Sequence, residues 1–166
     1  MKRFQALIFV AVLLTCVGCD HVTKQIAQSV LAGSPSVSLA ADMLRFELAS
    51  NPGAFLSLGA GLSSGLRQLI FVGLVPGLLA VICVVALRSD FFSGWSLVGL
   101  AFVAGGGLSN WIDRLLHGGA VTDFISFGLG SLRTGVFNLA DVSIVAGVAL
   151  LLLIWLRPGS SGDEAT

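Results

Sequence analysis

Four aspartates stand out because they lie in or beside stretches that are otherwise apolar. Asp20 follows the first stretch, Asp113 ends the third, and Asp141 is expected about two turns inside the fourth. Asp123 lies in the short loop expected between the third and fourth stretches. If the stretches cross a membrane alternately, all four carboxylates lie near one membrane face. Ionisable groups at membrane depth are costly and usually have a function, so this arrangement predicts a site.

Two of these carboxylates could act together on one water molecule. Carboxylates that lie close together in a medium of low dielectric constant cannot both ionise easily, so one keeps its proton. Such a pair can serve as general base and general acid, as in aspartic proteases. Asp141 is the natural buried member because it lies in an apolar helix, where Asn138 precedes it by three residues. Asp123 is its natural partner because glycines flank its loop.

Further polar residues accompany the carboxylates at helical spacing. Asn110, Asp113 and Arg114 stand at positions i, i+3 and i+4 and therefore share a helix face. Asp20 and Lys24 are four residues apart. Each set could be only a salt bridge or cap at a helix end, which contributes little where it is exposed. Polar residues at the same end of several helices favour a functional cluster, in which Lys24 pairs with Asp20 and Arg114 with Asp113.

The composition is that of a small integral membrane protein. Apolar residues make up 55% of the 166 residues and charged residues 11%, and the mean hydropathy is +0.96. These values are far from those of soluble proteins. We expect one membrane domain over residues 1–166, an all-α protein with four transmembrane helices. The predicted spans are about 4–20, 66–87, 91–112 and 136–156, and the external segments are about 21–65 and 113–135.

The first external segment carries signals for strands and turns. Its helix is expected to continue through Lys24 and to end at Gly33-Ser-Pro35. Residues 36–48 alternate imperfectly between polar and apolar types, which predicts short strands. Asn51-Pro-Gly53 indicates a turn. The segment therefore predicts a small strand-rich platform on the membrane surface.

Charge and residue spacing argue against several classes of protein. The net charge is zero and no basic stripe is present, which argues against nucleic acid as a partner. Cys16, Cys19 and Cys83 lie in or beside apolar stretches without the spacing of a disulfide framework or a metal site. His21 and His117 are far apart in sequence and form no zinc-binding pair. We therefore expect no metal and no cofactor.

Five short motifs follow one another along the chain. They are Asp20-His-Val-Thr-Lys24, Asn51-Pro-Gly53-Ala54, Gly106-Gly-Leu-Ser-Asn110-Trp-Ile-Asp113-Arg114, Val121-Thr-Asp123-Phe124 and Phe137-Asn138-Leu-Ala-Asp141. In order and spacing they resemble the motifs of bacterial lipoprotein signal peptidase (signal peptidase II). One such motif would be weak evidence, whereas five in order over roughly residues 4–156 are specific.

The resemblance implies an aspartic endopeptidase of the bacterial inner membrane. Such an enzyme cuts the signal peptide from a prolipoprotein just before a cysteine that carries diacylglycerol. Asp123 and Asp141 would form the catalytic dyad at the periplasmic face, beside a small periplasmic β-cradle and a short periplasmic helix. Expected partners are lipidated prolipoproteins, membrane lipid and globomycin-type inhibitors, and the protein is expected to be a monomer. The matched positions around the dyad are Asp20, Lys24, Asn51, Gly53, Asn110, Asp113, Arg114 and Asn138.

Two departures from the family pattern concern the segment around Asp123. The stretch from Asp113 to Asp123 is one residue longer than usual near Gly118-Gly119. Ser126 stands where the family often has another aspartate. A glycine-rich loop can absorb one residue, and neither departure removes the expected dyad.

The distribution of basic residues predicts the orientation. Lys2, Arg3, Arg88 and Arg157 lie in very short flanks on one side of the membrane. Five basic residues lie on the other side, spread over two much longer connections. The density of positive charge favours both termini in the cytoplasm.

One alternative is that the chain is a lipoprotein precursor. Cys16-Val-Gly-Cys19 follows a short apolar run and resembles a lipobox ending at Cys19. The residue three places before Cys19 is a cysteine rather than a large aliphatic residue, and three further spans would make a lipid anchor redundant.

A second alternative is a small proton-coupled transporter or channel, which would also use carboxylates within the membrane. Transporters usually place them near the bilayer midplane between repeated halves. Here the carboxylates lie near one interface and the sequence shows no repeat, which favours the peptidase.

Overall fold

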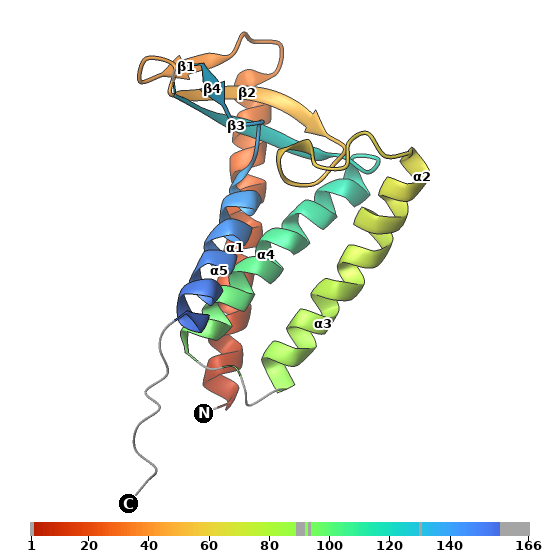
Figure 1. Cartoon of the computed structure of the whole chain (residues 1–166), viewed down its shortest axis with the longest axis vertical. Coiled ribbons are helices and arrows are strands. Elements are labelled where there is room, and N and C mark those ends of the chain that lie inside the picture. The colour runs from red at the N-terminus through yellow and green to blue at the C-terminus, as the bar shows by residue number, and fades with distance from the viewer. Residues whose placement is uncertain (1, 89–91, 93, 130, 157–166) are drawn as a thin grey trace, which may run out of the picture.

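The computed structural model describes residues 2–88, 92, 94–129 and 131–156 and places a bundle of helices beneath a small sheet (Figure 1). A π-helical segment (Gln68–Leu74) joins α2 to α3, so the chain is helical without a break from Ser64 to Arg88. A short 3-10 turn covers Phe55–Ser57. The helices are α1 (Lys2–Leu31), α2 (Ser64–Arg67), α3 (Val75–Arg88), α4 (Trp95–Leu116) and α5 (Leu139–Trp155).

The described helices include three that are long and apolar enough to cross a membrane: α1, the helix from Ser64 to Arg88, and α4. The chain is therefore a multi-pass membrane protein. Helix α5 is apolar but shorter, at 17 residues, so a fourth crossing stays a prediction. The expected start of the third span at residue 91, and Arg157 of the orientation argument, lie outside the described residues.

Helix α1 continues past Asp20 and Lys24, as predicted. It ends at Leu31, just before the break expected at Gly33-Ser-Pro35, and its 30 residues make it about 45 Å long. Its polar residues did not end the helix, since Asp20 and Lys24 are buried against other helices rather than exposed to water. The chain turns only at Gly33, whose φ of +72° suits glycine.

A four-stranded antiparallel sheet lies over one end of the bundle, in the order β1-β2-β3-β4 (Figure 1). The strands expected within residues 36–48 are confirmed by β1 and β2. The strands are β1 (Val37–Leu39), β2 (Leu44–Asn51), β3 (Val121–Leu129) and β4 (Leu132–Arg133).

The loop predicted around Asp123 is wrong, because these residues form β3. The backbone of β3 pairs with β2, with Asp123 opposite Ala49. Phe124 is buried and packs with Ala27 and Leu31 of α1. The glycines expected to make this region a loop lie at its edges, where Gly118 and Gly119 take positive φ angles in the turn after α4.

Helix α4 is the centre of the bundle and contacts α1, α3 and α5. Glycines on α4 allow this close approach. A Cβ atom on Gly105 would lie 2.8 Å from the Cβ of Cys16 on α1, and one on Gly106 would collide with the backbone carbonyl of Ala140 on α5. This packing brings the polar residues of the three helices to one place beneath the sheet.

Candidate functional site

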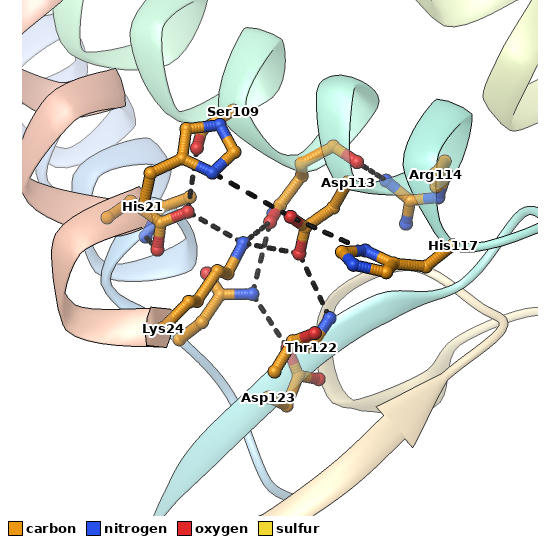
Figure 2. A network of polar contacts seen from close by, with 12 residues as sticks. His21, Lys24, Ser109, Asp113, Arg114, His117, Thr122 and Asp123 are labelled. Atoms are coloured by element: carbon orange, nitrogen blue, oxygen red, sulfur yellow. Dashed lines mark hydrogen bonds and ion pairs between the residues drawn. The ribbon is translucent and has the colours of Figure 1, made fainter. Parts of the chain in front are cut away.

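Lys24 joins two of the predicted carboxylates inside the protein. Its ammonium lies 2.6 Å from Asp20 Oδ2 and 2.9 Å from Asp113 Oδ2, and it donates a hydrogen bond of 3.1 Å to Asn110 Oδ1 (Figure 2). Lys24 is 2% exposed, and both aspartates are similarly buried. The three donors of the ammonium therefore all have partners, as a buried charge requires.

Asp20 connects three helices through its carboxylate. Besides its ion pair with Lys24, it accepts two hydrogen bonds. One comes from the hydroxyl of Ser109 on α4 at 2.7 Å, and the other from the backbone N–H of Ala140 on α5 at 2.9 Å. Ser109 is fully buried and was not predicted as a site residue. Its polarity within an apolar span, one residue before Asn110, is the signal that could have identified it.

Asp113 connects the end of α4 to the sheet. Its Oδ2 accepts the backbone N–H of Thr122 at 3.0 Å, which fixes the start of β3 one residue before Asp123. His21 and His117 lie beside its other oxygen, with Nδ1 at 3.9 and 3.8 Å from Asp113 Oδ1 (Figure 2).

Arg114 does not form the predicted pair with Asp113. Its guanidinium donates instead to the backbone carbonyl of Asn110 at 3.0 Å and to that of Gly53 at 2.6 Å. It also lies over the ring of Phe71, 5.0 Å from the centroid. The prediction was wrong because neighbouring helical residues point in different directions. Arg114 therefore fixes the turn after β2 against α4.

The turn at Asn51 is built around its side chain. Asn51 Oδ1 accepts the backbone N–H of Gly53 at 2.9 Å, and Nδ2 donates to Ala54 O at 2.9 Å and to Asp123 Oδ2 at 2.8 Å. A Cβ atom on Gly53 would lie 2.6 Å from the carbonyl oxygen of Leu58, so only glycine fits here. The turn thus carries one of the hydrogen bonds that hold Asp123.

Asn138 connects Asp123 to Asp141. Its Nδ2 donates to Asp123 Oδ1 at 2.6 Å and to Asn110 Oδ1 at 3.1 Å. Its backbone N–H donates to Asp141 Oδ2 at 3.2 Å, and its Oδ1 accepts the backbone N–H of Asp141 at 2.9 Å, which is a capping box. Asn110 Nδ2 donates to the remaining oxygen, Asp141 Oδ1, at 2.9 Å.

The predicted depth of Asp141 is wrong. Helix α5 begins at Leu139 rather than at residue 136, because Asn138 caps it, so Asp141 is the third residue of the helix instead of lying two turns inside. Asp141 is 4% exposed even so, because α4 and the sheet cover the helix start.

Asp123 lies on β3, outside the membrane-crossing helices, and is 1% exposed. Burial is the main cause that raises the pKa of its carboxyl from 3.8 to about 6; the negative charge of Asp141 acts in the same direction, and the hydrogen bond from Asn51 acts against it. Asp123 therefore holds a proton much more readily than an exposed aspartate. The two carboxylates lie close enough to influence each other's ionisation.

The arrangement has the parts needed for hydrolysis through two carboxylates. Among the residues that the structure describes, no group of three or more histidine, cysteine, aspartate or glutamate residues could hold a metal ion.

A groove of about 320 Å³ opens beside Asp141 and follows α5 along Val142, Val145 and Ala149, with Leu56 and Phe137 near its start. A largely apolar molecule could reach Asp141 along this groove.

The sequence matches a family model described as signal peptidase (SPase) II over residues 12–157. A lipoprotein signal peptidase of Gloeobacter violaceus is 35% identical over 150 residues, 89% of this chain and 80% of the relative. One from Bifidobacterium longum subsp. infantis is 31% identical over 168 aligned residues, 97% and 86% of the two chains. One from Klebsiella aerogenes is 37% identical over 117 residues, 70% of each.

Two solved structures of bacterial membrane enzymes are similar in fold. One has a TM-score of 0.79 at 24% identity and covers 95% of this chain and 93% of its own. The other has a TM-score of 0.77 at 26% identity, with 90% and 92% covered. The arrangement of helices and sheet is therefore that of a known membrane enzyme.

Proposed function

Because the chain belongs to the signal peptidase II family and removes signal peptides from prolipoproteins, we propose that it is an aspartic endopeptidase whose catalytic residues are Asp123 and Asp141. The observation that carries the proposal is their shared partner. Asn138 contacts both carboxylates, one from a strand and one from a helix, and both are buried. A water molecule between two such carboxylates is the nucleophile of an aspartic peptidase.

In this mechanism the two carboxylates hold one proton between them. The raised pKa of Asp123, about 6, favours such sharing. The ionised carboxylate takes a proton from the water as the oxygen attacks the scissile carbonyl. The protonated carboxyl gives its proton to the carbonyl oxygen. Collapse of the tetrahedral intermediate then transfers a proton to the leaving amine and frees the signal peptide.

The surrounding polar residues act as positioning residues. Asn51, Asn110 and Asn138 hold the catalytic carboxylates directly. The others act through the backbone elements that carry them, by joining α1, α4, α5 and the two strands. They are Asp20, Lys24, Gly53, Asp113 and Arg114.

The groove along α5 suits the apolar part of a lipidated precursor, because it begins at Asp141 and its other lining is almost wholly apolar. We assign to this site the peptide bond before a diacylglyceryl-modified cysteine. A cyclic peptide of the globomycin type would compete there. We further propose that the protein acts as a monomer.

The bacterial inner membrane is the proposed location, with four crossings, both termini in the cytoplasm and the site at the periplasmic face. The start of α1, the end of α3 and the start of α4 lie at the end of the bundle opposite the sheet (Figure 1). Arg3 and Arg88 belong to that end. This arrangement agrees with positive charge on the cytoplasmic side.

Neither alternative is favoured. Cys16 and Cys19 lie in the middle of α1, a continuous helix that packs on α4, so the lipobox-like segment is not an extended, cleavable sequence. The carboxylates gather beneath the sheet at one end of the bundle, rather than midway along it as in a transporter.

Cleavage of a diacylated precursor tests the proposal. Purified Asp123→Asn and Asp141→Asn variants are incubated with the precursor, and the loss of the signal peptide is followed by gel shift. Asp42→Asn is the matched control, because Asp42 is a carboxylate in the turn between β1 and β2 with its side chain 46% exposed. We expect cleavage by the control alone, blocked by globomycin. Processing by either dyad variant would refute the assignment.

A further inference from the structure

A second apolar groove lies between the outer end of α1 and the sheet, away from the groove beside Asp141. Its volume is about 260 Å³. That is smaller than most pockets for drug-sized ligands, and suits a slender chain. The lining includes Ile26, Ala27 and Val30 from α1, and Val37, Phe46 and Phe124 from the strands.

The side chains of the lining offer no free hydrogen-bond donor to a polar ligand. Thr23 is the one polar residue that lines the groove. Its hydroxyl is engaged with the backbone carbonyls of Cys19 and Asp20 in its own helix, both at 2.9 Å. A peptide or a lipid headgroup would therefore lose hydrogen bonds to water here without replacement, whereas a hydrocarbon chain would not.

The groove continues the membrane-facing side of α1. Large apolar side chains are exposed along the helix from Leu7 and Leu14 to Val22, Ile26 and Val30, the last being 62% exposed. Asp20 points to the opposite side, into the bundle. The exposed apolar side of α1 thus runs ten residues beyond Asp20 and reaches the groove, which favours membrane lipid as the occupant of the groove.

We propose that this groove binds one acyl chain of a membrane phospholipid. Phe124 lines the groove, and it follows Asp123 directly in β3, the strand that pairs with β2. Asp123 does not line the groove, so a chain in the groove does not touch it. It packs instead against the strand that carries Asp123, and thereby stabilises the position of that strand on α1.

Photolabelling tests the site without any need for catalysis. The full-length protein is placed in nanodiscs of phosphatidylcholine and phosphatidylglycerol with a small fraction of phosphatidylethanolamine that carries a diazirine in one acyl chain. Labelled residues are located by mass spectrometry of peptides. Val30→Trp and Ile26→Trp fill the groove from exposed positions, and Val22→Trp adds the same ring to the same side of α1 outside it.

We expect saturable labelling of the groove residues, competed by unlabelled phospholipid, and only non-saturable labelling at Leu14. In Val30→Trp and Ile26→Trp the groove labelling falls to the level at Leu14, whereas Val22→Trp retains it. Elution volume and helical content confirm that each variant is folded. Labelling in proportion to exposure along all of α1 would overturn the proposal. So would groove labelling that only a lipidated precursor displaces, because the groove would then belong to the substrate.

Discussion

Asn138 donates its side-chain amide to Asp123 at 2.6 Å while its own backbone and side chain cap the helix that carries Asp141. One residue therefore sets the positions of both proposed catalytic carboxylates. The backbone before it contributes as well, since Phe137 exchanges hydrogen bonds of 2.8 and 2.9 Å with Ile125 of β3. The start of α5 is thus fixed to the strand that holds Asp123.

Two substitutions at Asn138 separate its cap from its amide. Asn138→Ala removes both, and we expect a loss of about 1 kcal/mol of stability, typical of a lost cap, together with loss of cleavage. Asn138→Ser keeps an oxygen that can cap α5 but has no amide for Asp123. The unfolding temperature of Asn138→Ser should therefore lie between those of Asn138→Ala and the wild type, because the buried acceptors on Asp123 and Asn110 still lack the amide, and cleavage of a precursor should stay low. Cleavage restored by serine would show that only the cap matters.

The raised pKa of Asp123 predicts how stability depends on pH. The Asp123 carboxyl contributes to the free energy of unfolding. This contribution is fully present below about pH 4, where the carboxyl is protonated in both the folded and the unfolded state, and it is lost as pH rises through about 6. This shift in the pKa of Asp123 corresponds to about 3 kcal/mol in the free energy of unfolding. The stability of the wild type relative to Asp123→Asn should therefore fall between pH 4 and 7, measured by thermal unfolding in detergent. A difference that stays constant over this range would contradict the shift.

Loss of the buried Lys24 should be much more damaging than loss of an exposed cation. Lys24→Met leaves the carboxylates of Asp20 and Asp113 buried without a cation, which typically costs about 3–5 kcal/mol. Arg45→Met is the control, because the exposed Arg45–Asp42 pair, 2.7 Å apart, is expected to contribute about 1 kcal/mol or less. Equal unfolding temperatures of the two variants would show that the buried network does not hold the helices together.

The contact between α4 and α5 has no room for a side chain at Gly106. Gly106→Ala places a Cβ against the carbonyl of Ala140 and 2.8 Å from Ile144 Cγ1, and overpacking of this kind costs about 1–3 kcal/mol. Because Ala140 precedes Asp141, we also expect slower precursor cleavage. Gly65→Ala is the control, since a Cβ there meets open space. Full activity of Gly106→Ala would mean that α5 can shift without disturbing the site.

The sequence predicted most elements, and failed where an interaction partner lies far away in the chain. The strands of residues 36–48 follow from local alternation. Strand β3 does not, because its pairing with β2 joins Asp123 to Ala49, which no local pattern reveals. Similarly, the spacing of Asp20 and Lys24 predicts their ion pair, but it does not reveal that Lys24 also reaches Asp113 on α4.

Side-chain direction explains the remaining errors at the site. Arg114 and Asp113 are neighbours in sequence, yet one reaches the Gly53 turn and the other Lys24 and Thr122. The sequence predicts too great a depth for Asp141 because the apolar run begins at residue 136, three residues before the helix does. The Asn138–Asp141 spacing, typical of a capping box, would have placed the helix start correctly.

The single-turnover cleavage rate of the Asp123→Ala/Asp141→Ala double variant tests most directly whether the two carboxylates act together on one water. Residues that act as a unit have non-additive effects, because losing either one disables the pair. We predict that the double variant cleaves a diacylated precursor no more slowly than the slower single variant. A rate reduced by the product of the two single effects would contradict a shared catalytic role for Asp123 and Asp141.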